Sequence, residues 1–117
     1  MNCEFGQVIR DEFCGKIYIS GENESDHEIL WESSLITPPT GTISVYNERT
    51  SSDFLTFRIM HMKNQKTLSV SPGNSRSFTS SGLQSFQLVN IRAVTGMSQG
   101  TYSLTIHYEF FLEPCND

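Results

Sequence analysis

The sequence predicts an all-β protein, an antiparallel β-sandwich or barrel of about eight strands. Three observations support this prediction. Short runs of alternating or nearly continuous apolar residues recur along the chain after residue 15. Clusters of Gly, Pro, Asn and Ser, the residues that most readily reverse a chain, separate these runs. No segment keeps the 3.6-residue apolar period that is typical of an amphipathic helix.

The first half of the chain contains two clearly alternating runs. KIYIS places Ile17 and Ile19 on one face, and TISVYN places Ile43 and Val45 on one face. Each run therefore predicts a strand with one buried and one exposed face. HEILWES, which lies between them, takes the remaining strand position.

The second half of the chain is richer in apolar residues. FLTFRIMHM, residues 54–62, predicts a strand that meets protein on both faces. In KTLSV, Leu68 and Val70 alternate with polar residues, and SFTS and LQSFQLVNI predict two further strands. The most regular run is the last, TYSLTIHYEFFL, where the even-numbered residues from Tyr102 to Tyr108 share one face.

Turns are predicted between these strands, because Gly and Asn tolerate positive φ and Pro fixes φ near −65°. We interpret GMSQG as a loop before the last strand, because it has no strand-to-helix context. The predicted turn clusters are Ser20 to Asn23, Pro38 to Gly41, Asn64-Gln65, Ser71 to Asn74, Ser80 to Gly82 and Gly96 to Gly100.

Length, charge and hydropathy limit the class of protein. A chain of 117 residues fits one domain with one core. The net charge is −5 and the eight Lys and Arg residues are scattered singly along the sequence, so we expect no nucleic-acid partner. No stretch approaches about 18 consecutive apolar residues, and the N-terminus lacks a signal-peptide pattern, so we expect no membrane partner. The chain is cytosolic, a mature fragment, or exported without a secretory signal peptide.

The residues that could carry chemistry form no recognisable constellation. His27, His61 and His107 are far apart, without the spacing of zinc ligands. The chain has no nucleophile elbow, phosphate-binding loop or dinucleotide fingerprint, and most acidic residues fall in turns. We therefore expect no enzymatic activity, no catalytic residues, no metal site and no cofactor.

Trp31 gives the alternative function. A lone Trp in HEILWES is more often a core residue, but an exposed Trp on a β-sandwich can stack on a sugar ring. A carbohydrate-binding, lectin-like module is therefore the second hypothesis.

The three cysteines, Cys3, Cys14 and Cys115, are the most informative residues. They cannot all pair within one chain, so one is free or at least one bonds another molecule. In a jelly roll the first and last strands are antiparallel neighbours, so we expect Cys14 and Cys115 near the same end of the molecule. An extended segment of eleven residues, the separation of Cys3 from Cys14, spans up to about 35 Å. We divide the chain into a flexible N-terminal connector, residues 1–13, and a β-sandwich domain, residues 14–117.

Four segments together resemble a known family. SPGNSRSFTSSGLQSFQLVNI and GTYSLTIHYEF resemble the C-terminal half of the endospore appendage (Ena) subunits of spore-forming bacteria. WESS and GTISVYN resemble segments of the same family, and the resemblance follows the whole chain in order. The shared pattern is one of strands and turns rather than a catalytic signature.

The resemblance implies a jelly-roll subunit that assembles with copies of itself into a fibre on the spore surface, together with a protein that anchors it. In that family a connector carrying cysteine forms disulfides with the next layer, and subunits within a layer join their sheets edge to edge. Cys3 matches the connector cysteine and Cys14 a cysteine at the first strand. Many members have a cysteine pair in the connector and a cysteine in the last strand, where this chain has YSLT, residues 102–105; here the third cysteine is Cys115. This difference suggests stacked rings rather than a tightly cross-linked helix.

Equivalent subunits joined head to tail use two different cysteines for each kind of bond, so three cysteines permit one repeating bond and one remainder. We expect Cys3 to bond Cys14 or Cys115 of a neighbouring subunit. Cys14 is favoured because it lies on the ordered start of the sheet rather than on a terminal tail. A bond between Cys14 and Cys115 of one chain is the alternative, and it would leave Cys3 unpaired.

Open strand edges are expected at TISVYN and LQSFQLVN. These runs contain no Lys and no Pro, the residues that usually protect an edge from pairing with another chain. Such edges could accept a strand of a neighbouring subunit through main-chain hydrogen bonds.

Overall fold

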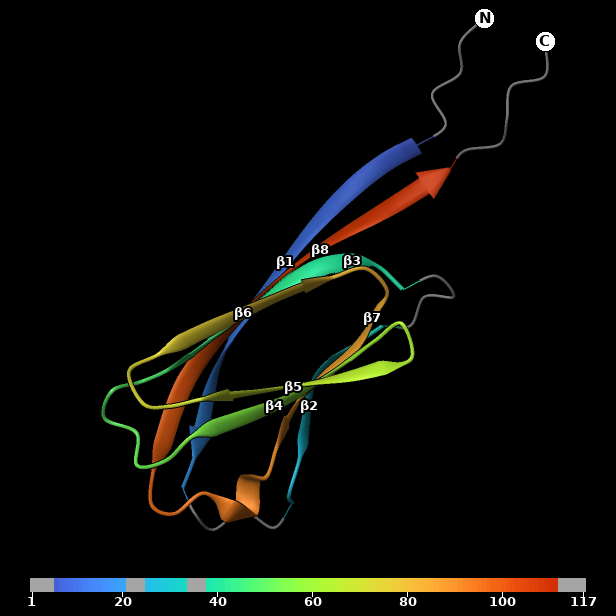
Figure 1. The fold of residues 1–117 in the computed structure, drawn as a ribbon. Helices are drawn as coiled ribbons and strands as arrows, with labels where there is room; N and C mark the ends of the chain where they lie inside the picture. Colours follow the sequence, from blue (N-terminus) through green and yellow to red (C-terminus); the bar gives the residue numbers. More distant parts are fainter. Residues whose placement is uncertain (1–5, 21–24, 34–37, 112–117) are drawn as a thin grey trace, which may run out of the picture.

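The protein is an all-β sandwich of two four-stranded antiparallel sheets, as the sequence predicts (Figure 1). The computed structural model describes residues 6–20, 25–33 and 38–111, with side chains for residues 10–20, 25–33 and 38–107. Its strands are β1 (Gly6–Ile19), β2 (Glu28–Glu32), β3 (Thr40–Asn47), β4 (Leu55–His61), β5 (Asn64–Val70), β6 (Ser75–Ser80), β7 (Leu83–Val89) and β8 (Ser98–Phe111). A 3₁₀ turn, η1 (Ile91–Ala93), precedes β8. Among the described residues no helix is long and apolar enough to cross a membrane.

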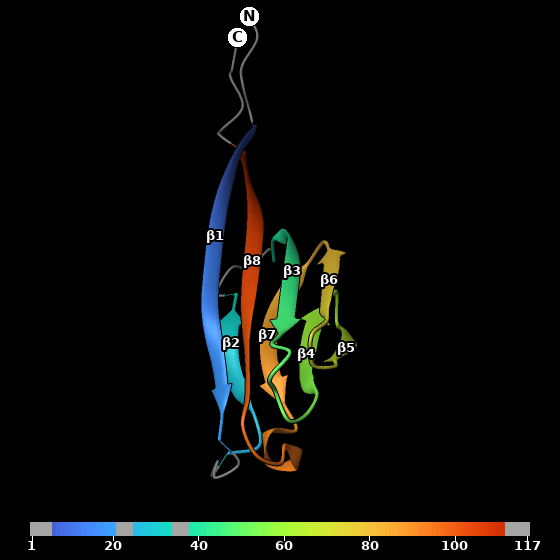
Figure 2. The same cartoon turned by 90° about the vertical axis from the view of Figure 1, so that its left-hand side faces the viewer.

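The strand order pairs the first and last strands. One sheet has the order β1-β8-β3-β6 and the other β2-β7-β4-β5 (Figures 1 and 2). We call them the β1 sheet and the β2 sheet. Successive strands lie in different sheets except β4 and β5, which form a hairpin. We interpret this order, two interleaved sheets with neighbouring terminal strands, as that of a jelly roll.

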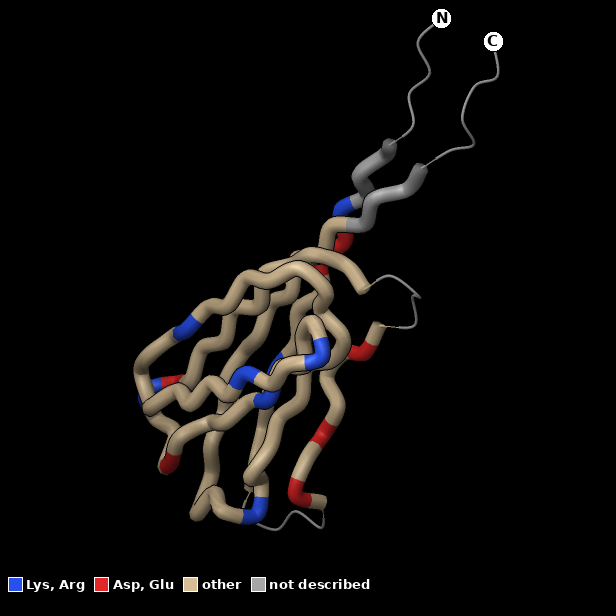
Figure 3. Tube along the Cα trace, turned by 45° about the vertical axis from the view of Figure 1, so that its right-hand side comes forward, with Lys and Arg blue, Asp and Glu red and all other residues tan. Residues whose placement is uncertain are grey.

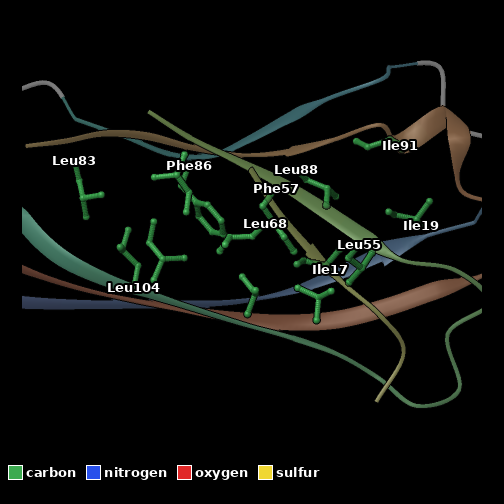
Figure 4. Close-up of a cluster of buried hydrophobic side chains, with 14 of the residues drawn as sticks. Ile17, Ile19, Leu55, Phe57, Leu68, Leu83, Phe86, Leu88, Ile91 and Leu104 are labelled. Atoms are coloured by element: carbon green, nitrogen blue, oxygen red, sulfur yellow. The ribbon is translucent and has the colours of Figure 1, made fainter. Parts of the chain in front are cut away.

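The core lies between the two sheets and is built by alternation along each strand. Ile17 and Ile19 of β1 and Ile43 and Val45 of β3 are buried, as their spacing predicts. Leu68 and Val70 of β5 and Leu104 and Ile106 of β8 are buried from the same cause. Figure 4 shows side chains from both sheets meeting in one cluster.

Three local predictions are corrected. β1 begins at Gly6 and contains Cys14, so the first strand starts well before KIYIS. β8 begins at Ser98, so the second half of GMSQG belongs to the last strand rather than to a loop. The outer side of β4 is half-buried, so only one face of this strand meets the other sheet. The division of the chain at residue 13 stays a prediction.

The turn between β4 and β5 lies at Met62 and Lys63, not at Asn64-Gln65. Both turn residues have positive φ, 47° and 63°. A two-residue hairpin turn of this kind favours Asn-Gly, because a side chain on a left-handed residue clashes with its own backbone. Met62 and Lys63 are therefore strained.

Lys63→Gly is expected to raise the free energy of unfolding by about 1 kcal/mol relative to Lys63→Ala. Both variants remove the same long side chain, but only glycine relieves the left-handed conformation. Urea unfolding of the two variants measures the difference, and equal stabilities would show that the turn is not strained.

Candidate assembly surfaces

The two terminal strands form a long ribbon that extends beyond the rest of the sandwich. β1 and β8 pair without interruption from Gly6 with Phe111 to Ile19 with Ser98. β3 joins β8 only as far as His107, so the last four residues of β8 pair with β1 alone. Figure 2 shows β1 and β8 running past the other strands at one end. The described chain thus begins and ends at the tip of one two-stranded ribbon.

Cys14 lies on β1 inside the four-stranded part of the sheet. It faces Ser103 of β8, which in turn faces Ser44 of β3. Because Ile17 and Ile19 point into the core, Cys14 shares the outer face with Lys16 and Tyr18. The thiol is free and exposed. It is therefore available to a partner that approaches the outer side of the β1 sheet.

Cys3 and Cys115 lie outside the described residues, but the length of chain limits where each can reach. Cys14 is eight residues from Gly6 along an extended strand, about 26 Å. Three residues separate Cys3 from Gly6, which allows about 10 Å, and four separate Cys115 from Phe111, which allows about 14 Å. A disulfide needs Cα atoms within about 7 Å. While β1 and β8 remain paired, neither cysteine can reach Cys14 of its own chain.

Cys14 lies inside the ribbon and not at its tip, because β1 and β8 continue eight residues beyond the pair of Cys14 with Ser103. The expected closeness of Cys14 and Cys115 stays a prediction, because Cys115 lies outside the described residues. A Cys14 to Cys115 bond within one chain would require the end of the ribbon to open, and it stays an alternative prediction. The Cys3 to Cys115 bond is the intrachain bond that chain length permits, because Gly6 and Phe111 face each other.

The open edges differ from those expected. TISVYN forms β3, which lies between β8 and β6, and LQSFQLVN forms β7, which lies between β2 and β4. Both are interior strands, so their lack of Lys and Pro reflects pairing on both sides and not an edge ready to pair. The edges are β1 and β6 in one sheet and β2 and β5 in the other.

Exposed charged side chains lie at the sheet edges. Lys66 lies on β5, Lys63 on the turn before it and Arg76 on β6, and all three are exposed. Glu28 and Glu32 lie at the two ends of β2 and are also exposed. The described part of β2 thus carries acidic residues, and β5 and β6 carry basic ones, whereas β1 carries both signs.

The histidines lie on separate elements. His27 is exposed before β2, and His107 faces Arg10 across the terminal ribbon. His61 is half-buried at the end of β4, where its Nδ1 lies 3.0 Å from the hydroxyl of Ser80. Within the described ranges, no group of three His, Cys, Asp or Glu side chains is placed to hold a metal ion.

Trp31 is half-buried and packs against the core cluster. Its ring therefore contributes to the sandwich interior, and this placement gives no support to a sugar-stacking platform.

Known proteins provide two comparisons for this fold. The model of a family described as "Endospore appendages" (Enas) matches residues 1–110. A solved structure described by the words "Bacillus endospore appendages form a novel family of disulfide-linked pili" is similar to this chain, with a TM-score of 0.69 and 16% identity over 97% of this chain and 97% of that one. At this identity the likeness supports the fold alone. No curated protein matches the chain.

Proposed function

Because this chain belongs to the endospore appendage family, we propose that it is a structural subunit that assembles with copies of itself into a pilus-like fibre on the spore surface. The family match confirms the resemblance found in the sequence. The proposed role is mechanical, so the subunit is not an enzyme and needs no cofactor. A separate protein on the spore surface would anchor the fibre.

The observation that carries this proposal is the isolation of Cys14. Its thiol is exposed on the outer face of β1 and is beyond the reach of both other cysteines of its chain. While β1 and β8 stay paired, a disulfide at Cys14 would join two subunits, and this is the bond that we propose. Cys3 of another copy is the partner that we propose, because it follows from the ribbon tip on a short tether.

A Cys3 to Cys14 bond can be repeated from one subunit to the next along a fibre. Each subunit offers one cysteine at the tip of its ribbon and another about 26 Å back along β1. The two sites differ, so the contact is head to tail and can continue from layer to layer without closing on itself. Cys115 is then the remainder, or the partner of Cys3 in the alternative bond between neighbouring subunits.

Contacts within a layer are proposed at the sheet edges. Edge strands carry main-chain N–H and C=O groups that lack a partner on one side. Pairing of the edges of two subunits would satisfy these groups and continue one sheet into the next. In the resulting fibre, pairing of sheet edges joins the subunits within a layer, and disulfides join one layer to the next. The layers are either stacked rings or turns of a helix.

Negative-stain microscopy with and without reductant tests the proposed function. We expect long fibres under oxidising conditions, and shorter rings, layers or monomers once a thiol reductant is added. Monodisperse monomers under oxidising conditions would contradict the proposal, and so would fibres of unchanged length after complete reduction.

A further inference from the structure

The outer side of the β1 sheet is lined by hydroxyl groups. Outward positions alternate with buried ones along each strand, so they are the even-numbered residues of β3 and the odd-numbered residues of β6 and β8. Where these three strands pair in common register, every outward side chain is Ser, Thr or Tyr. We call this surface the hydroxyl face, and its residues are Thr42, Ser44, Tyr46, Ser75, Ser77, Thr79, Thr101, Ser103 and Thr105.

The strand register aligns these hydroxyls in rows across the sheet. Ser103 faces Ser44, which faces Ser77, and the rows on either side are aligned in the same way. The hydroxyl oxygens of Ser44 and Ser77 lie 2.9 Å apart and those of Thr42 and Thr79 lie 2.8 Å apart, so each pair is hydrogen-bonded. Each hydroxyl has one hydrogen and two lone pairs, so a bonded pair can still bind a further group. The hydroxyls therefore repeat about every 4.8 Å across the strands and about every 7 Å along them.

The hydroxyl face itself carries no charge. β3 and the part of β8 with described side chains contain no Asp, Glu, Lys or Arg, and Figure 3 draws both in tan. Arg76 of β6 faces Val45, so it belongs to the alternate positions and not to the hydroxyl face. The neighbouring strand β1 carries both signs on this side of the sheet, with Arg10 and Lys16 beside Glu12. We therefore expect an uncharged partner that is held by hydrogen bonds rather than by ion pairs.

Two exposed tyrosine rings lie on the same side of the sheet. Tyr18 of β1 is 63% exposed and Tyr46 of β3 is 40% exposed. The Tyr18 hydroxyl donates to Sδ of Met97, 3.2 Å away, and this bond restrains the ring. Tyr18 faces Gln99 and Tyr46 faces Thr101, so the two tyrosines are two strands and two residues apart, about 12 Å between their Cα atoms. The two rings can therefore contact separate units of one extended ligand.

We propose that the hydroxyl face, together with Tyr18, binds a neutral, extended polysaccharide. A sugar ring has an apolar face of C–H groups that stacks on an aromatic ring, and hydroxyls at its rim that both donate and accept hydrogen bonds. This surface offers exposed aromatic rings and rows of hydroxyls side by side. Cellulose and chitin are uncharged and present their rings along a flat ribbon, so they are the chains that suit it.

A protein partner suits the same surface less well. The buried centre of a protein interface is usually apolar and depleted in Ser, whereas the hydroxyl face has no aliphatic side chain other than Thr. In a fibre, each subunit would contribute one such surface, so weak contacts with a polysaccharide would act together. The inference thus goes beyond assembly and gives the fibre a class of ligand.

Co-sedimentation with insoluble cellulose and with insoluble chitin tests this inference. The full chain is kept reduced, so that disulfides do not join the subunits. We expect the wild type to be retained on at least one of the two polysaccharides. A variant with Tyr18→Ala and Tyr46→Ala should bind about tenfold more weakly, because both stacking rings are lost.

Matched variants separate the rings from the hydroxyls. Tyr18→Phe with Tyr46→Phe keeps both rings and should bind within about threefold of the wild type. Thr101→Val with Ser103→Ala nearly keeps the shape of β8 but removes two hydroxyls, and it should bind more weakly than the wild type. Circular dichroism confirms that every variant is folded.

Two controls accompany the measurement. Ile29→Ala removes an exposed apolar side chain from the other sheet and should leave binding unchanged. Sodium chloride at about 1 M, where the Debye length is about 3 Å, should also leave binding unchanged, because no ion pair contributes to it.

Three results would overturn the inference: wild type that binds neither polysaccharide, an alanine variant that binds as the wild type does, or binding that is lost at about 1 M salt. A second copy of the chain is the other occupant. If the alanine substitutions change the sedimentation coefficient of the reduced protein but not its retention, the face serves self-association and the inference is wrong. Each of these results is distinguishable from failure of the proposed function, since oxidised wild type would still form reductant-sensitive fibres.

Discussion

Cys3→Ser is expected to abolish longitudinal growth of the fibre while leaving the domain folded. Under oxidising conditions the variant should form layers or smaller species in place of long fibres, because no thiol remains on the N-terminal tether. Cys14→Ser should have the same effect, since it removes the proposed recipient of the bond. Microscopy and non-reducing electrophoresis measure the loss, and we expect the disulfide-linked ladder to disappear in both variants.

Cys115→Ser is the matched control, because it removes a cysteine that the proposed bond does not use. It should retain fibres as long as those of the wild type. Loss of fibres in Cys115→Ser together with intact fibres in Cys14→Ser would assign the bond to Cys3 and Cys115. Long fibres from Cys3→Ser would contradict the proposal that the N-terminal segment links one layer to the next through Cys3.

Phe86→Ala is expected to cost about 3–5 kcal/mol of stability. Phe86 is fully buried on β7, where it stacks on Phe57 with ring centroids 5.4 Å apart. It also makes an edge contact with Tyr102 of β8, at 5.5 Å, and thus joins the two sheets. Removing the ring both leaves a cavity between the two sheets and loses the free energy gained by burying its apolar surface.

Chemical denaturation in a background with all three cysteines replaced by serine measures this loss, because a monomer unfolds more nearly in two states. Gln87→Ala, on the half-buried outer side of the same strand, is the control and should change stability by about 0.5 kcal/mol or less. A cost below about 1 kcal/mol for Phe86→Ala would show that the cavity closes by repacking.

The strands were predictable because their signal is local. Alternation along KIYIS and TISVYN determines which residues can face a core, and Ile17, Ile19, Ile43 and Val45 are buried as that alternation requires. About eight strands were expected, and the described residues form eight. The turn at Met62 and Lys63 was misplaced because neither residue is a usual choice for positive φ.

The order of the strands could not be predicted in the same way, because pairing is a property of segments far apart in the sequence. Absence of Lys and Pro from β3 and β7 predicts an open edge, but it is equally the composition of a strand paired on both sides. The length of the terminal ribbon was missed for a similar reason. Residues 6–13 alternate weakly, and their partners lie about a hundred residues later in β8.

Two features of the assembly surfaces depended on the fold. The separation of Cys14 from both termini became visible only when β1 and β8 were found paired as far as Gly6 and Phe111. The basic residues at the edges of β5 and β6 had a signal in the sequence, the lack of Asp and Glu between Phe54 and Tyr108. The sequence alone does not show that these basic residues share one side of the molecule. The fold shows it, because β5 and β6 lie on one side of the sandwich, and β1 and β2 lie on the other.

Isotope mixing distinguishes a disulfide that joins Cys14 to a second subunit from one within a single chain. Equal amounts of ¹⁴N-labelled and ¹⁵N-labelled subunits are reduced, mixed, oxidised into fibres and digested without reductant for mass spectrometry. We expect the peptide containing Cys14 to be linked to the peptide containing Cys3, and about half of these linked pairs to combine the two isotopes. A free Cys14 thiol in mature fibres, or linked pairs that never combine isotopes, would contradict it.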